Sequence, residues 1–283
     1  MRYSSVAIRL ISSDYSLRTK TMENDKHSSR WYQNLWAALI FFTRLPFWRI
    51  YQPPQPSYKA VVECWPLAGW LTGGIMAAAL YLGSMVFPWP VAVVIAIVIR
   101  LLVTGALHED GLADFLDGMG GGTDRDRILA IMKDSHIGTY GVIGLILYIL
   151  LLGATLCYMP PRIAALAVLA ADPFAKLVAC SLVMMLPYAR REEEAKNKTI
   201  YRTMDIRAVI SLLLQGLLPM SLMLWSTGIQ WYVVVLVPCI VMSFLYILIK
   251  RKIGGYTGDC CGAVCLLVEL SVYLTVSSLL TLW

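Results

Sequence analysis

Long apolar stretches alternate with short polar connections along most of the chain. A helix needs about 20 apolar residues to cross a bilayer, and seven stretches approach or reach that length. They lie at 65–87, 89–107, 138–158, 162–187, 208–226, 231–249 and 261–282. The stretch from Asn34 to Trp48 is shorter, contains Arg44 and is closed by Pro46. The pattern predicts an all-α polytopic membrane protein with about seven transmembrane helices plus an N-terminal interfacial or re-entrant helix.

The first 30 residues differ from the rest of the chain. Residues 1–30 are polar and basic. A signal peptide requires a continuous apolar core after its first charges, and these residues contain none. Frequent Ser and Thr with few acids are also typical of organelle transit peptides, but we expect a disordered cytoplasmic tail. Residues 31–283 are predicted to form a single membrane-embedded domain that carries any catalytic site.

Basic residues separate the polar connections into two groups. The connections that contain them are 44–63, 108–137, 188–207 and 250–260. The alternate connections, 87–90, 159–161 and 226–230, are short and uncharged. Seven crossings place every basic connection on one side, which the positive-inside rule predicts to be the cytoplasm. The formal net charge of +6 therefore reflects membrane topology and gives no indication of nucleic-acid binding.

The connection 108–137 begins with the acidic run HEDGLADFLDG. Asp110, Asp114 and Asp117 stand at positions i, i+4 and i+7, so they share one face of a helix. Three carboxylates this close repel one another unless a divalent cation neutralises them. Oxygen ligands favour Mg²⁺, Mn²⁺ or Ca²⁺, and Mg²⁺ commonly takes its remaining ligands from substrate phosphates. The run therefore predicts a metal site for phosphoryl transfer, the alternative being a solvated acidic loop.

Further polar residues follow this run. Thr123 is predicted to cap a short amphipathic helix over 124–133. Its apolar residues are able to rest on the membrane surface, and they are Ile128, Leu129, Ile131 and Met132. Lys133 could then hold a phosphate, and His136 could orient one or shuttle a proton, beside Asp134. Ordinary capping and snorkelling at a helix start is the alternative for these three residues.

The stretch GGYTGD at 254–259 has three glycines, which let a backbone turn sharply and present N–H groups to an anion. Asp259 could bind metal or a ribose hydroxyl there, and a plain turn is equally compatible. Asp172 and Lys176 are predicted to pair inside the bundle, since they lie one helical turn apart within an apolar stretch. A structural role and a contact with substrate are equally compatible with this pair. Glu63, Arg100 and Glu269 lie near or just within span ends and could line the same cavity. For Arg100, an alternative is that its side chain extends to the membrane surface.

Three strings, in order, resemble the cobalamin synthase family: HEDGLADFLDGMGGG, MKDSHIGTYG and GGYTGD. The resemblance extends from about FFTRLP, which begins at Phe41, to the C-terminus. The resemblance implies an adenosylcobinamide-GDP ribazoletransferase that joins adenosylcobinamide-GDP to α-ribazole or its 5′-phosphate and releases GMP. One departure is the pair Asp172-Pro173, where the family leads us to expect an Arg.

The resemblance also implies roles for individual residues. Glu109, Asp110 and Asp114 are the catalytic candidates, and Mg²⁺ is the expected cofactor, held by Asp110, Asp114 and Asp117. The substrate-binding candidates are Arg44, Lys133, Asp134, His136, Tyr256, Thr257 and Asp259. The expected location is the bacterial cytoplasmic (inner) membrane with the active site facing the cytoplasm, and a complex with other corrinoid-pathway enzymes is left open.

The run DG-x-x-D is also similar to the motif of the CDP-alcohol phosphotransferases, although the match is partial. Two other classes of protein remain open. A cation- or proton-coupled transporter would use the same carboxylates, usually near the bilayer midplane and in inverted repeats. A membrane scaffold would need neither the carboxylate stripe nor the glycine-rich turn.

Overall fold

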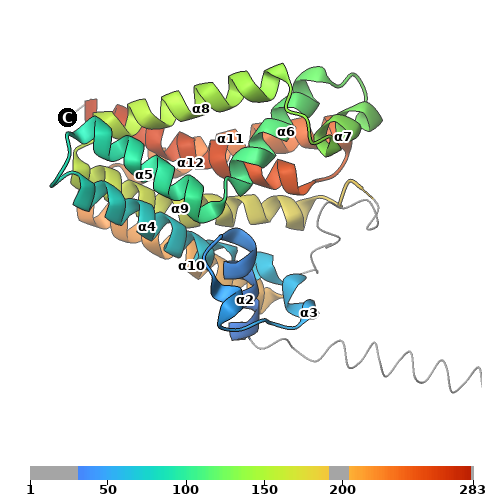
Figure 1. Cartoon of the computed structure of the whole chain (residues 1–283), viewed down its shortest axis with the longest axis horizontal. Coiled ribbons are helices and arrows are strands. Elements are labelled where there is room, and N and C mark those ends of the chain that lie inside the picture. The colour runs from blue at the N-terminus through green and yellow to red at the C-terminus, as the bar shows by residue number, and fades with distance from the viewer. Residues whose placement is uncertain (1–30, 191–203, 282–283) are drawn as a thin grey trace, which may run out of the picture.

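A computed structural model describes residues 31–190 and 204–281, so the predicted tail at 1–30 lies outside the described residues. Helices make up nearly all of this part of the chain (Figure 1). The helices are α2 (Trp31–Phe42), α3 (Gln55–Tyr58), α4 (Trp65–Gly83), α5 (Trp89–Thr104), α6 (Leu107–Gly121), α7 (Arg125–Lys133), α8 (Thr139–Tyr158), α9 (Pro161–Met185), α10 (Ile206–Thr227), α11 (Trp231–Ile253) and α12 (Gly258–Thr281). Two short 3₁₀ helices, η1 (Phe47–Arg49) and η2 (Val61–Cys64), flank α3.

Six helices in the described ranges are long and apolar enough to cross a membrane, and a seventh crossing is present if α5 and α6 count as one bent span. This confirms the predicted all-α polytopic class. The short helix α2 overlaps the first part of the stretch predicted to lie at the interface. The span predicted at 89–107 is shorter than expected, because α5 ends at Thr104 after 16 residues.

The break between α5 and α6 consists of two left-handed residues. Gly105 has φ +65° and Ala106 has φ +54°, and α6 leaves at 89° to α5. Ala106 is unusual in this region because its Cβ is crowded there. The backbone N–H of Arg44 donates to the carbonyl of Val103 at 2.7 Å, which satisfies one of the groups freed where α5 ends. The bend turns the acidic run into a separate helix, α6, at one end of the bundle.

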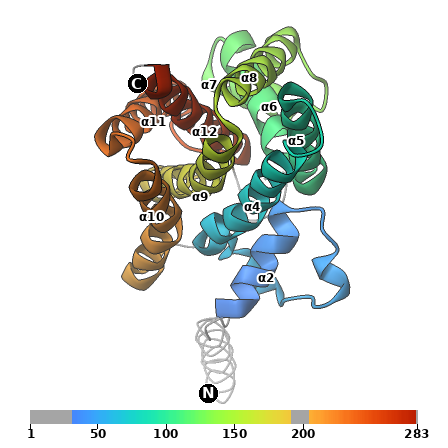
Figure 2. The same ribbon diagram turned by 90° about the vertical axis from the view of Figure 1, so that its left-hand side faces the viewer.

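The helix α9 lies inside the bundle, packed against α4, α10 and α12 (Figure 2). Glycines allow α4 to approach it closely. A Cβ on Gly69 would lie 2.9 Å from Cα of Pro173, and a Cβ on Gly73 would lie 3.0 Å from Cβ of Asp172. Small residues at helix contacts are typical of membrane proteins, where close packing replaces the hydrophobic driving force between helices.

Two groups of buried charges cross-link the bundle. Lys176 pairs with Asp172, as predicted, and Thr72 Oγ1 on α4 donates to Asp172 Oδ2 at 2.7 Å. The prediction that Arg100 extends to the membrane surface is wrong. Its side chain is buried in a bidentate pair with Glu269 at 2.5 and 2.6 Å. The hydroxyl of Tyr273 also donates to Glu269. A charge in an apolar interior is costly unless it is paired. Each charge in these two groups has a partner of opposite sign.

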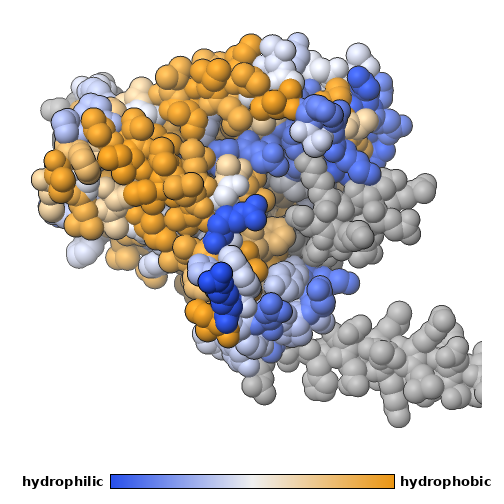
Figure 3. Space-filling view, in the orientation of Figure 1, coloured by the Kyte–Doolittle hydropathy of each residue, from blue (hydrophilic) through white to orange (hydrophobic). Residues whose placement is uncertain are grey.

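Apolar residues cover the body of the bundle in the view of Figure 3, and hydrophilic residues gather toward the end that carries α6 and α7. The predicted cap of α7 is wrong, and so is the predicted surface position of two of its four apolar residues, since Leu129 and Ile131 are partly exposed but the other two are not. Asp124, rather than Thr123, caps the helix, with its Oδ1 accepting from the N–H of Arg127 at 3.0 Å. Ile128 and Met132 are fully buried, where they pack against Gly118 of α6 instead of resting on a membrane surface.

Candidate active site

The helix α6 meets the start of α12 at two glycines. A Cβ on Gly111 would lie 3.2 Å from Cα of Asp259, and a Cβ on Gly262 would lie 3.2 Å from the carbonyl oxygen of His108. Any side chain at either position would push the two helices apart. This close contact brings the acidic run and the GGYTGD stretch, which are far apart in sequence, to one place.

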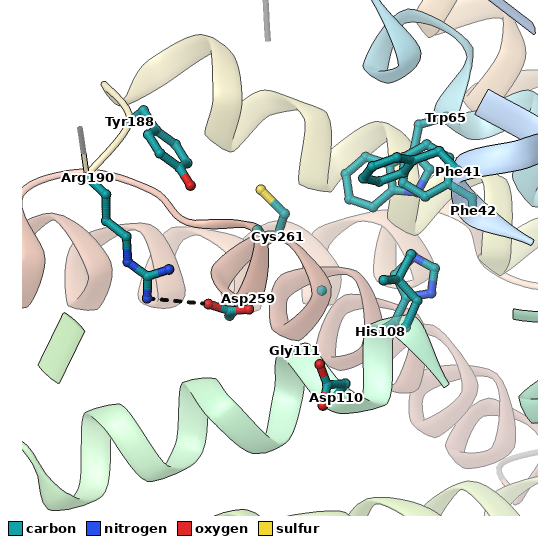
Figure 4. Close-up of a pocket in the computed structure, with 13 residues that line it drawn as sticks. Phe41, Phe42, Trp65, His108, Asp110, Gly111, Tyr188, Arg190, Asp259 and Cys261 are labelled. Carbon is teal, nitrogen blue, oxygen red and sulfur yellow. Dashed lines mark ion pairs between the residues drawn. The ribbon is translucent and has the colours of Figure 1, made fainter. Parts of the chain in front are cut away.

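A cavity of about 160 Å³ opens beside this contact (Figure 4). Its lining residues come from α2, α4, α6, α12 and the segment after α9. They are Phe41, Phe42, Trp65, Leu107, His108, Asp110, Gly111, Tyr188, Arg190, Gly258, Asp259, Cys261 and Gly262. Charged residues and aromatic residues both contribute, which makes this cavity the candidate site.

The charged residues of the cavity are Asp110, Asp259 and Arg190. Arg190 Nη2 lies 3.8 Å from Asp259 Oδ2, and it also donates to the carbonyl of Leu129 at 3.1 Å. The carboxylate of Asp110 is exposed, and it makes no hydrogen bond or ion pair with any described residue. The cavity therefore offers two carboxylates and one guanidinium to a ligand.

This set of donors suits Mg²⁺. Mg²⁺ is usually held by one or two carboxylates, with substrate phosphates and waters completing its coordination. Asp110 and Asp259 supply two such carboxylates, and Arg190 supplies a cation for phosphate. Within residues 31–190 and 204–281, no three His, Cys, Asp or Glu side chains converge enough to hold a metal by themselves.

Backbone pairing holds Arg190 and Tyr188 at the cavity. The N–H of Ala189 donates to the carbonyl of Tyr256, and the N–H of Tyr256 donates to the carbonyl of Pro187, both at 2.9 Å. The rings of Tyr188 and Tyr256 meet edge to face at 5.3 Å. Burial raises the pKa of the Tyr188 phenol. The GGYTGD stretch therefore positions residues 187–190 as well as Asp259.

All three predicted substrate-binding residues in that stretch are buried, and Asp259 is the most exposed of them at 7%. Tyr256 is 3% exposed and Thr257 is fully buried. Thr257 Oγ1 accepts from the N–H of Cys260 at 3.2 Å, which caps the start of α12. Of Tyr256, Thr257 and Asp259, only Asp259 lines the cavity.

The three carboxylates of the predicted metal stripe lie on one helix but in different surroundings. Asp110 lines the cavity, and Asp114, one turn further along α6, is partly buried. Asp117 points to α8, where its two oxygens accept from the N–H groups of Gly138 at 2.6 Å and Gly141 at 2.8 Å. Asp117 thus binds the positive N-terminal end of α8, where N–H groups lack partners within the helix.

The predicted catalytic residue Glu109 is not among the lining residues of the cavity. Its side chain is 6% exposed, and its Oε2 has no hydrogen-bond partner among the described residues. The buried charges of Arg100, Glu269 and Lys176 act on it. Glu109 therefore faces the interior of the bundle.

The remaining predicted substrate-binding residues lie on the surface. Lys133 is exposed at the end of α7. His136 Nδ1 lies 2.7 Å from Asp134 Oδ1, and the hydrogen bond from His136 lowers the pKa of the Asp134 carboxyl. Arg44 is exposed, and its side chain occupies the space where a Cβ of Gly105 would lie. None of these four residues lines the cavity.

Other residues of the cavity carried no signal in the sequence. Arg190 is one of several basic residues in its connection, and nothing local distinguishes it from Arg191. Phe42, Trp65 and His108 are brought together by the packing of three separate helices. A pattern along the chain cannot reveal such a contact.

Comparisons with known proteins agree on one family. The family model described as cobalamin-5-phosphate synthase matches residues 34–277. Proteins named adenosylcobinamide-GDP ribazoletransferase are similar over most of the chain. The protein from Shewanella frigidimarina is 33% identical over 87% of this chain and 96% of its own length. The protein from Shewanella amazonensis is 38% identical over 87% of this chain and 94% of its own length. No solved structure matches the chain.

Proposed function

The chain belongs to the cobalamin-5-phosphate synthase family, and from this premise we propose that it is an adenosylcobinamide-GDP ribazoletransferase. Its substrates would be adenosylcobinamide-GDP and α-ribazole or α-ribazole 5′-phosphate, and its products adenosylcobalamin or its 5′-phosphate and GMP. The observation that carries the proposal is the cavity where Asp110, Asp259 and Arg190 meet. Two carboxylates and a guanidinium around one cavity suit a substrate with a pyrophosphate.

The reaction exchanges one P–O bond for another. A ribose hydroxyl of the acceptor forms a bond to the phosphorus attached to cobinamide, and the bond from that phosphorus to GMP breaks. GMP leaves with the bonding electron pair, and the hydroxyl proton goes to a base. We propose Asp114 as this base. It is partly buried, lies one helical turn from Asp110 and does not itself line the cavity, so the proton would reach it through a bound water.

Arg190 would hold the pyrophosphate through its positive charge, while its bond to Leu129 keeps its orientation. Asp110 and Asp259 would hold Mg²⁺ on the cavity side. When bound, Mg²⁺ supplies positive charge that stabilises the phosphate oxygens and the leaving GMP. The close contact at Gly111 fixes the spacing of the two carboxylates.

We further propose that the protein lies in the bacterial cytoplasmic membrane with this cavity facing the cytoplasm. The cavity lies at the same end of the bundle as α6 and α7, whereas the short α4–α5 and α8–α9 connections lie at the other (Figure 1). Basic residues gather in the connections of the cavity end, in agreement with the positive-inside rule.

The fold does not favour the transporter alternative. A coupled transporter needs membrane-embedded carboxylates that can release and take up ions. Asp172 and Glu269, two of the carboxylates buried in the bundle, are each paired with a cation and a hydroxyl. These carboxylates act as packing contacts.

The test is GMP release by the purified full chain in liposomes. Adenosylcobinamide-GDP is supplied with and without α-ribazole 5′-phosphate, first with Mg²⁺ and then with EDTA. We expect release only when both acceptor and metal are present. Release without the acceptor would indicate a hydrolase, and no release from a folded protein would overturn the proposed activity.

A further inference from the structure

Aromatic rings line the end of the cavity away from Arg190 (Figure 4). The rings of Phe42 and Trp65 are stacked, with centroids 5.0 Å apart and planes 8° from parallel. The ring of His108 lies 6.0 Å from Trp65 and is 11° from parallel with it. Phe41, which is partly exposed, completes this group. We call Phe41, Phe42, Trp65 and His108 the aromatic wall.

Two nitrogen atoms of the aromatic wall are buried without a partner. Neither Trp65 Nε1 nor His108 Nε2 makes a hydrogen bond within the described residues, although the two side chains are only 3% and 2% exposed. Buried polar atoms are nearly always hydrogen-bonded, and those that are not call for an explanation. The indole N–H can only donate, so Trp65 requires an acceptor that the described protein does not supply.

We propose that the aromatic wall binds the planar nitrogen heteroaromatic base of a nucleotide substrate, with Trp65 Nε1 donating a hydrogen bond to that base. This inference rests on the proposed function and deepens it. Both substrates of that reaction carry such a base: guanine in the GDP group, and a benzimidazole in the ribazole. Aromatic side chains stack on the faces of bases, and a ring nitrogen or carbonyl oxygen of the base accepts from the indole.

The layout of the cavity matches a nucleotide. Arg190 and the two carboxylates are suited to phosphate and metal, while the aromatic wall offers the partly exposed ring of Phe41, the edges of the stacked rings and one donor that no described residue uses. A ligand with a charged phosphate and a flat base can reach both. Water could occupy the cavity, but it would gain nothing from the parallel rings.

The experiment measures binding of two probes separately to the full chain in nanodiscs. The probes are α-ribazole 5′-phosphate and GMP, and they distinguish the two sources of the base. Trp65→Phe keeps the stacking and removes the donor, so we expect it to raise the Kd of one probe about 3- to 10-fold. Trp65→Ala removes both contacts, so we expect it to raise that Kd about 10- to 100-fold. Phe41→Ala, at a partly exposed position, provides a second variant if Trp65→Ala does not fold.

Trp70→Phe is the matched control on the same helix. The indole of Trp70 donates to the carbonyl of Gln215 at 2.8 Å, and Trp70 does not line the cavity. The Trp70→Phe variant should therefore leave the Kd values of both probes unchanged. In turnover assays the Trp65 variants should raise the KM of only the substrate whose base they contact.

The outcomes separate this inference from the proposed function. Loss of affinity for α-ribazole 5′-phosphate alone assigns the aromatic wall to the acceptor, and loss for GMP alone assigns it to the GDP group. Unchanged affinity for both probes in every folded variant would overturn the inference while GMP release by the wild type stands. Equal loss for both probes would also overturn it, because one subsite takes one base.

Discussion

Carboxylates lie in two different settings in this protein. Inside the bundle, Asp172 and Glu269 are each paired with a cation and accept from a hydroxyl. At the cavity, no described residue pairs with Asp110, and Arg190 lies 3.8 Å from Asp259. The same chemical group therefore holds helices together in one setting and is available to a ligand in the other.

The difference follows from the cost of burial. A charge in an apolar interior needs a partner, so it contributes to the packing of the bundle. The carboxylate of Asp110, which is exposed at the cavity, keeps its charge without a partner among the described residues and can bind a cation when one arrives. Removing a carboxylate in the two settings should thus affect two different properties, stability and turnover.

The largest expected effect is on turnover at the cavity. Asp110→Asn and Asp114→Asn should each lower GMP release by at least about 1,000-fold, because a metal ligand or a base contributes several kcal/mol to the barrier. Folding should be largely unchanged, since Asp110 is exposed and Asp114 is only partly buried. Rates of GMP release and thermal unfolding of the same samples provide the measurement.

Asp126→Asn is the control for this pair. Asp126 is an exposed carboxylate on the neighbouring helix α7, paired at 3.2 Å with Arg125 on the surface. Surface pairs contribute little, so its rate should stay within about 2-fold of wild type. If Asp110→Asn kept a near-normal rate in excess Mg²⁺, the assignment of that residue to the metal would be withdrawn.

The second effect is on stability in the bundle. Arg100→Met leaves Glu269 buried without its cation, so the free energy of unfolding should fall by about 3–5 kcal/mol. The double variant Arg100→Met, Glu269→Met removes both charges and should recover most of that loss. Denaturant titration in detergent measures both. A single variant as stable as wild type would show that the buried pair contributes no more than an exposed one.

The contrast also explains which parts of the structure could be predicted. Apolar length and loop charge specified the fold class, because a bilayer requires long apolar helices. The pairing of Asp172 with Lys176 could be predicted because both lie on one helix, four residues apart. Arg100 and Glu269 lie on different helices, so their contact depends on packing that no local pattern contains.

The same limit applies at the cavity. The helical stripe at Asp110, Asp114 and Asp117 was predicted correctly as a helix, but a shared face does not mean a shared environment. The bend at Gly105 and Ala106 and the start of α8 decide which carboxylate meets which neighbour. Arg190 and Trp65 enter the cavity through tertiary packing alone.

A third, smaller effect should show that helix packing controls the geometry of the cavity. Gly111→Ala places a methyl group 3.2 Å from the backbone of Asp259. Such overpacking costs about 1–3 kcal/mol, and displacing Asp259 from Asp110 should slow GMP release by about 10- to 100-fold. Gly153→Ala is the matched control, because a Cβ at that helical glycine of α8 meets nothing within 4 Å. Equal rates for the two variants would show that the close contact of α6 with α12 does not set the site.

The smallest effect concerns Asp117, which belongs to the acidic run. Like the carboxylates of the bundle, it already has partners within the protein, which are two backbone N–H groups. Asp117→Asn keeps one acceptor oxygen and loses the charge that holds two N–H groups of α8. The free energy of unfolding should fall by about 1–2 kcal/mol. The Mg²⁺ concentration that gives half-maximal turnover should not change, because Asp117 faces α8 and does not line the cavity. If that concentration rose several-fold while stability stayed at the wild-type value, Asp117 would be a metal ligand, and all three carboxylates of the run would act together.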